Sequence, residues 1–314
     1  MKGMVLANNK FRKALTVLTA AVVLLGSFLA FTQPAKAATQ YKYFYVMTKS
    51  VSEYTSDGMS YTTTEKNSYY DTGLLKKNEI VCDGDFSEAF KNTYTRYKNG
   101  QVKTTKVYNL YWIHPLQFYT KTTLEKGKPK KDIIYAYDND GIRYRYGTKT
   151  YTYKSGKLSK TVQKGTDQYG TVMKETITYY KNGNPKKQVY TDSNTNGSTK
   201  SVREYDKNGY PVKHVYTDSY GTETYVYKNT YNKKGDPTKI VANLSYTPAV
   251  GSNTSAYSIK FVTTYKYTYK HGNIIKCVQT QKSTQDNGYT STNKTTTKYS
   301  YKKVKVAKKY WKFF

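Results

Sequence analysis

A repeat of about 27 residues, marked by glycines, constrains this chain more than any other feature. The glycines are Gly73, Gly100, Gly127, Gly156, Gly183, Gly209, Gly235 and Gly272. The first six intervals are 27, 27, 29, 27, 26 and 26 residues, and the last is 37. Such a period is typical of stacked supersecondary units that are each too small to bury a core alone. The units must therefore fold as one continuous array.

The residues around each glycine predict a β-hairpin. An aromatic residue usually stands three or four positions earlier, as Tyr180 stands before Gly183. Asn-Gly and Lys-Gly dipeptides supply the positive φ that a tight hairpin turn needs. A second turn follows about half a period later, for example at Asp218-Ser-Tyr-Gly221. Each unit therefore predicts two strands and two turns.

The strand after each glycine has its own pattern. An apolar residue or proline stands two positions after the glycine, lysine usually stands four after it, and a β-branched residue usually stands six after it. These offsets share one face of an unbroken strand, so we expect the lysines on an apolar face. Elsewhere Tyr265, Tyr267 and Tyr269 alternate with Thr and Lys, which predicts one aromatic face and one polar face.

The predicted fold class is all-β. We expect an extended antiparallel β-meander of two-strand repeats, in a single twisted or curled sheet. A closed barrel is the alternative, because open sheets of more than about ten strands usually curl, split or close. Residues 38–314 form a single domain in this interpretation, with repeats over about 65–310. Residues 299–314 are a degenerate C-terminal cap in which Val304 replaces the glycine.

The two cysteines are a candidate disulfide. Cys82 and Cys277 stand in the first and eighth units. If they pair, the two ends of the sheet meet, and if they do not, they are ordinary small core residues. Sequence spacing alone leaves both interpretations open.

The first 37 residues have the features of a secretory signal peptide. Four basic residues precede an apolar stretch over residues 14–31, and Ala35-Lys36-Ala37 forms a small-x-small cleavage site. We therefore expect an extracytoplasmic protein, secreted or associated with the cell surface, with no transmembrane segment after signal removal.

The net charge indicates a polyanionic partner. The whole chain carries +31, and five basic residues and no acidic ones precede residue 38, which leaves +26 on residues 38–314. A charge of this size attracts polyanions, and export favours an anionic cell-envelope polymer or glycan over nucleic acid. The candidate contacts are Lys131, Lys160, Lys187, Lys213, Lys239, Lys276, Tyr265, Tyr267 and Tyr269. The alternative is that the lysines only keep a tyrosine-rich sheet soluble and its edges unpaired, while the tyrosines form the core.

No catalytic pattern is visible, so we expect no enzyme, cofactor or metal. His114, His214 and His271 are scattered without the spacing of metal ligands, and no nucleophile motif occurs. The predicted function is that of an exported, non-enzymatic β-repeat protein that binds envelope polyanions. A structural or adhesive surface protein with a protein partner is the alternative. An outer-membrane barrel is less favoured, because each lysine at mid-bilayer would cost about 2–4 kcal/mol.

Three elements resemble the YD (Rhs-type) repeats of bacterial secreted and surface proteins. They are Tyr205-Asp-Lys-Asn-Gly209, Tyr137-Asp-Asn-Asp-Gly141 and Tyr231-Asn-Lys-Lys-Gly235. The resemblance implies extended β-hairpin sheets that spiral, and export from the cell. The period here is longer than in that family.

Overall fold

The computed structural model describes residues 41–56, 59–84, 88–110, 115–138, 140–194, 197–251 and 254–313. The signal peptide predicted for residues 1–37 lies outside these ranges. The described chain contains eighteen β-strands and one short 3-10 helix, η1. The strands are β1 (Tyr41–Ser56), β2 (Met59–Tyr69), β3 (Leu75–Gly84), β4 (Glu88–Arg96), β5 (Val102–Asn109), β6 (Leu116–Glu125), β7 (Lys128–Tyr137), β8 (Arg143–Lys154), β9 (Lys157–Thr166), β10 (Val172–Tyr179), β11 (Pro185–Asn194), β12 (Gly197–Tyr205), β13 (Pro211–Asp218), β14 (Gly221–Tyr231), β15 (Pro237–Pro248), β16 (Tyr257–Lys270), β17 (Asn273–Gln285) and β18 (Thr290–Ala307), and η1 spans Lys308–Phe313.

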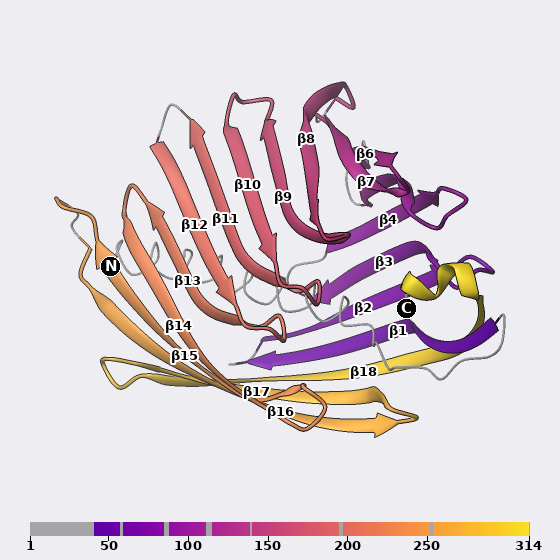
Figure 1. Ribbon diagram of the computed structural model, residues 1–314. Coiled ribbons are helices and arrows are strands. Elements are labelled where there is room, and N and C mark those ends of the chain that lie inside the picture. The colour runs from indigo at the N-terminus through magenta and orange to yellow at the C-terminus, as the bar shows by residue number, and fades with distance from the viewer. Residues whose placement is uncertain are drawn as a thin grey trace.

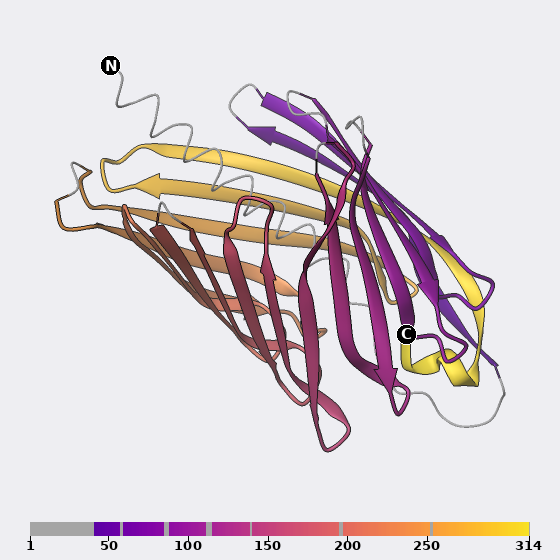
Figure 2. The same ribbon diagram turned by 90° about the horizontal axis from the view of Figure 1, so that it is seen from above.

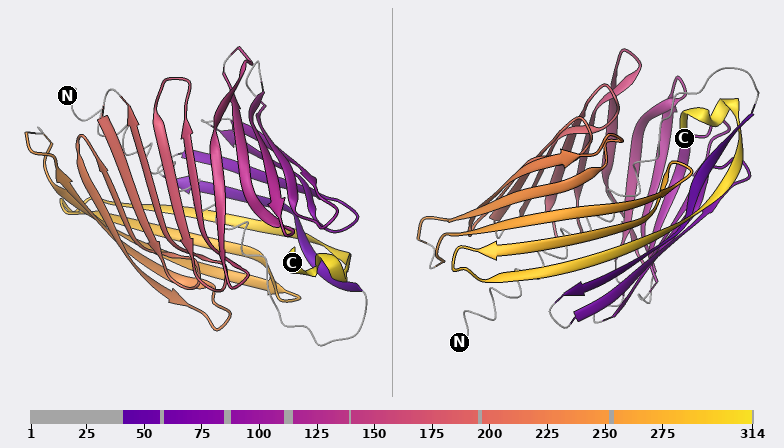
Figure 3. Two further views of the ribbon diagram at one scale, coloured as in Figure 1. Left: turned by 45° about the horizontal axis from the view of Figure 1, so that its top comes forward. Right: turned by 90° about the horizontal axis from the view of Figure 1, so that it is seen from below.

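The sheet is an antiparallel meander that closes on itself (Figure 1). Each strand pairs with its neighbours in sequence, and β1 pairs with β18 from Tyr41↔Ala307 to Thr55↔Lys294. Figures 2 and 3 show the resulting ring of strands. The all-β meander predicted from the sequence is confirmed, and it takes the closed-barrel form. Residues 299–307, assigned to the cap from sequence, continue β18 through Val304 and form part of the closing seam.

The alternation of strand direction gives the barrel two distinct ends. The eight glycine turns join β2 to β3, β4 to β5 and so on to β16 and β17, so all of them lie at one end, called here the glycine end. The opposite ends of the paired strands, such as Asp218 on β13 and Gly221 on β14, form the other end of the barrel. In five of the glycine turns, those of Gly73, Gly100, Gly183, Gly209 and Gly235, the glycine N–H donates to a carbonyl three residues back. Gly183 donates to Tyr180 at 3.0 Å and has a φ of +94°.

A β-bulge follows every glycine turn and changes which face the lysines occupy. In β12 and β13, Tyr205 pairs with Pro211 but Glu204 pairs with Lys213, so Val212 is the extra residue. The same shift occurs at the other seven glycine turns. Because a bulge adds one residue to one strand, the residue at offset two and the lysine at offset four face opposite sides. The expectation that they share a face is therefore wrong.

Contacts between non-adjacent strands identify the inner face. The Tyr146 hydroxyl on β8 lies 3.1 Å from the Met173 sulfur on β10. The rings of Phe118 on β6 and Tyr146 on β8 lie edge to face at 5.6 Å between centroids. Side chains from strands two apart converge on the concave side of a curved sheet and diverge on its convex side. Because side chains alternate between the two faces of a strand, the register of the strand pairs then assigns each remaining strand residue to the inner or the outer wall.

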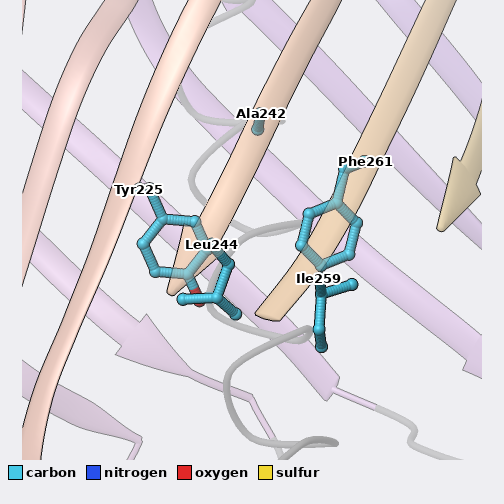
Figure 4. Close-up of a cluster of buried hydrophobic side chains, with 5 residues drawn as sticks. All are labelled: Tyr225, Ala242, Leu244, Ile259 and Phe261. Carbon is cyan, nitrogen blue, oxygen red and sulfur yellow. The ribbon is translucent and has the colours of Figure 1, made fainter. Parts of the chain in front are cut away.

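The inner wall carries the apolar core as a thin layer. Tyr225 on β14, Ala242 and Leu244 on β15, and Ile259 and Phe261 on β16 form its main buried cluster (Figure 4). Direct cross-strand pairs, Tyr225↔Leu244 and Leu244↔Ile259, hold these side chains in contact. The core is a lining of the sheet rather than a layer between two sheets.

The tyrosine before several of the glycines links neighbouring repeats at the glycine end. The Tyr97 hydroxyl donates to the Thr122 carbonyl at 2.7 Å, and the Tyr180 hydroxyl donates to the Tyr205 carbonyl at 2.7 Å. Each bond spans 25 residues, close to one repeat. The tyrosine therefore buries its ring in one unit and satisfies its hydroxyl on the next, which explains why it recurs with the glycine.

The C-terminal η1 packs against one glycine turn. A β-carbon placed on Gly100 would lie 2.5 Å from the Phe313 ring and 3.0 Å from the Tyr310 ring. The Tyr310 hydroxyl points to the Lys98 carbonyl at 3.5 Å, and Lys42 lies 4.0 Å from the Trp311 ring centroid. Gly100 therefore has a packing role beyond its turn, whereas a β-carbon on Gly183 would meet nothing within 4 Å.

We predict that Gly100→Ala destabilises the protein more than Gly183→Ala. Both substitutions strain a left-handed residue, at φ of +89° and +94°, which costs about 1–2 kcal/mol. Gly100→Ala also displaces η1, which adds about 1 kcal/mol or more. Urea unfolding measures the difference. In a Phe313→Ala background the difference should shrink, and a difference that persists there would contradict the packing explanation.

Candidate binding surfaces

The six lysines predicted from sequence all lie on the outer wall and are exposed. They follow the glycine turns at offset four, so the bulge behind each turn directs them outward. Lys187 and Lys213 both pair across the strands with Glu204 of β12. The Lys187 ammonium lies 3.0 Å from the Glu204 carboxylate. The remaining predicted lysines, on β7, β9, β15 and β17, occupy equivalent places.

The three predicted tyrosines lie on the inner wall of β16. Tyr265 and Tyr267 stack with ring centroids 6.2 Å apart, and Tyr267 and Tyr269 lie 6.0 Å apart. Burial raises the pKa of Tyr269 to about 12, with the Asp236 carboxylate that it hydrogen-bonds adding to the rise. Burial is also the main cause of the raised pKa of Tyr265. These tyrosines belong to the lining of the barrel.

The six predicted lysines and the three predicted tyrosines therefore do not form one composite surface. On β16, Lys266 faces outward between the inward Tyr265 and Tyr267. A single ligand on the outer wall would meet the lysines and miss these rings. The candidate contacts predicted from the sequence include both residue types, but the closed sheet places these lysines on its outer wall and these tyrosines on its inner wall.

Register groups the outer-wall residues of β9–β13 into three rows that run across the strands. The glycine-side lysine row contains Lys160, Thr178, Lys187, Glu204 and Lys213. The valine row contains Val162, Thr176, Val189, Val202 and Val215. The distal lysine row contains Lys164, Lys174, Thr191, Lys200 and Thr217. Adjacent rows are two residues apart along each strand, or about 7 Å.

The distal lysine row was missed by reasoning from sequence. Lys164, Lys174 and Lys200 have no constant offset from the glycines, so the repeat does not mark them. Only the pairing of β9–β12 aligns them beside the valine row. Each of these lysines lies two residues from a Val or Thr of its own strand. That spacing places them on one face of the strand, but it does not show which residues lie side by side on neighbouring strands.

Several carboxylates face inward, which leaves the outer wall more positive. Glu65 on β2 accepts hydrogen bonds from Asn78 at 2.8 Å and from Asn67 at 3.1 Å. Asp132 on β7 accepts from the Tyr151 hydroxyl at 2.6 Å. These groups are held by neutral donors of the inner wall.

His214 on the inner wall is held neutral by its surroundings. Its ring stacks on Tyr225 at 5.6 Å between centroids, and its Nε2 lies 2.9 Å from the Ser201 hydroxyl. Burial, together with the smaller effect of the positive charge of Arg203, lowers the pKa of His214 to about 4. A histidine with so low a pKa is a weak base, so the Ser201–His214 contact is best explained as packing.

The low pKa of His214 makes the free energy of unfolding depend on pH. The folded pKa lies below the unfolded value of about 6.5, so the unfolded chain takes up a proton first as the pH falls. His214 should therefore remove up to about 3 kcal/mol of stability between about pH 6.5 and pH 4. His214→Gln should lose less stability over that range in urea unfolding. Equal losses in the two proteins would contradict a buried, neutral His214.

The two cysteines are free and too far apart to bond. They face inward on one row, with Thr297, Ser52 and Thr63 on the three strands between them. Four strand spacings separate Cys82 from Cys277, about 19 Å along the sheet, whereas a disulfide needs α-carbons within about 7 Å. The candidate pairing is not formed. The ends of the sheet do meet, but through backbone pairing of β1 with β18.

The described residues hold no group of three or more potential metal-ligating side chains. In the same part of the chain, no helix has the length and apolar character required to cross a membrane.

Comparison with known proteins gives limited similarity. No protein-family model matches the chain, and no curated protein matches it. Among solved structures, a porin-like protein from Bacteroides uniformis aligns with a TM-score of 0.39 and 13% identity, covering 82% of this chain and 96% of that one. A porin-like protein from Bacteroides vulgatus aligns at 0.32 and 11%, covering 82% and 98%. Similarity at this level does not define a function.

Proposed function

We propose that this protein is an extracytoplasmic, non-enzymatic β-barrel whose outer wall binds anionic cell-envelope polymers or glycans. The observation that carries the proposal is the separation of the walls. The bulges direct the repeated lysines outward, while tyrosines and several carboxylates face inward. The charge of +26 on residues 38–314 is therefore presented mainly on a convex surface that a long polymer can reach.

The binding energy would come from many weak contacts. One exposed ion pair contributes about 0.2–1 kcal/mol, which is too little for specific capture. Lysines that recur on alternate strands can engage successive charges of one polymer, and the linked contacts add as avidity. Such binding weakens steeply with salt, because screening acts on every contact.

Insertion of this wall into a lipid bilayer is disfavoured by its row spacing. On β9–β13 the valine row is flanked by the two lysine rows, which lie four residues apart, or about 13 Å. A lipid-facing barrel needs an apolar band about 25 Å tall. Lysines would therefore fall within the hydrocarbon layer.

The alternative function is a structural or adhesive role in which the protein binds another protein. It predicts binding that tolerates salt, because protein interfaces depend more on buried apolar contacts than on exposed charges.

The test is binding of purified residues 38–314 to sodium alginate, to poly(glycerol phosphate) and to neutral dextran. Fluorescence anisotropy or co-sedimentation would be measured from about 0.05 M to 1 M NaCl, over which the Debye length falls from more than 10 Å to about 3 Å. We expect binding to at least one polyanion that weakens at least about tenfold, and no binding to dextran. Absence of polyanion binding, or salt-insensitive binding, would refute the proposal.

A further inference from the structure

We propose that the valine row on β9–β13 is a track for one linear anionic glycan, which lies across the strands with the lysine rows on its two sides. This inference rests on the proposed function and assigns it a site and a ligand class. The glycan's uncharged carbon skeleton would contact the valines, and its acidic groups would reach the flanking ammonium groups.

The two lysine rows give the track a positive charge on both sides. Lys160, Lys187 and Lys213 are exposed on the glycine side, and only Glu204 offsets them there. The distal row adds three exposed lysines, and no carboxylate lies in that row. A ligand that follows the valine row therefore meets positive charge on either side along its length.

One pair in the distal row is unfavourable without an anion. Lys164 and Lys174 are direct cross-strand partners on the outer wall, and like charges directly opposite each other destabilise a sheet. No described carboxylate lies within 4.0 Å of either ammonium group. An acidic group placed between them would convert this repulsion into attraction.

The track is hollowed toward its β13 end. A concavity of about 300 Å³ lies over β11–β13 and is lined by Val202 and Val215, by Lys187, Lys200 and Lys213, and by Glu204 and Thr217. Two of these three lysines belong to the glycine-side row and one to the distal row. Val202 and Val215 therefore share one hollow with lysines of both rows.

The spacing of the lysines favours a glycan with separated charges. Successive lysines of the glycine-side row are two strands apart, or about 10 Å, which is comparable to the length of a disaccharide. A glycan with one carboxylate per disaccharide matches this repeat. A polyol phosphate carries its charges more densely and would leave some of them unmatched.

The test uses hyaluronan oligosaccharides, which carry one carboxylate per disaccharide, with poly(glycerol phosphate) as the second arm. The variant Lys160→Gln/Lys187→Gln/Lys213→Gln removes the glycine-side charges. The control Lys121→Gln/Lys266→Gln/Lys294→Gln removes three exposed outer-wall charges from β6, β16 and β18. Net charge is equal in both, so the comparison isolates position. Circular dichroism and urea unfolding confirm that both fold.

We expect the track variant to bind hyaluronan at least about tenfold more weakly than the wild type, because three ion pairs are lost. The slope of log affinity against log salt should fall by about 2–3. The control variant should change the affinity for hyaluronan by less than about threefold. That change is smaller than the contribution of one strong ion pair. Affinity should rise with oligosaccharide length up to about 20 Å, the width of the five strands, and only slowly beyond it.

Other results separate the possible failures. Equal weakening of the two variants would overturn the track but keep general polyanion binding. Position dependence seen with poly(glycerol phosphate) alone would overturn the glycan assignment. If the wild type binds no polyanion, the proposed function fails as well. A Val189→Thr/Val202→Thr variant that binds as tightly as the wild type at high salt would also contradict contact with the valine row.

Discussion

The β-bulge behind each glycine turn is the feature on which the rest of the structure depends. A strand alternates strictly between its two faces, so one extra residue exchanges the faces of everything that follows. Without the bulge, Lys213 would lie on the same wall as Pro211 and Tyr205; with it, Lys213 pairs with Glu204 on the outer wall. Because all eight glycine turns carry the bulge, the repeated lysines line one wall.

Closure of the barrel keeps the lysine wall and the tyrosine wall apart. In an open meander both faces would remain accessible, and a ligand could reach lysine and tyrosine around one edge. Pairing of β1 with β18 removes the edges and so avoids the edge-strand liability of a long sheet. The hydroxyl groups of Tyr97 and Tyr180 then link their repeats to the next ones at the glycine end. The repeat thus stabilises the barrel and distributes charge over it.

Much of the fold was predictable from the sequence, because turn chemistry and alternation are local. The glycine turns, the strand pairs and the aromatic face of Tyr265, Tyr267 and Tyr269 follow from short-range patterns. The bulge was not predictable, since the offsets fit an unbroken strand equally well. Closure pairs Tyr41 with Ala307, and no short-range sequence pattern predicts a pairing between residues so far apart in the chain. The alignment of Lys164, Lys174 and Lys200 depends on the register of four strands, so it emerged only from the structure.

The most direct test of the account is a disulfide across the closing seam. Val51 on β1 pairs with Lys298 on β18, both on the outer wall. In a Cys82→Ser/Cys277→Ser background, Val51→Cys/Lys298→Cys should oxidise to an intramolecular disulfide detected by non-reducing mass spectrometry. The control Val51→Cys/Thr292→Cys, with the second cysteine six residues away on β18, or about 20 Å, should remain reduced. Failure of the first pair to form, or equal oxidation of both, would contradict a closed barrel.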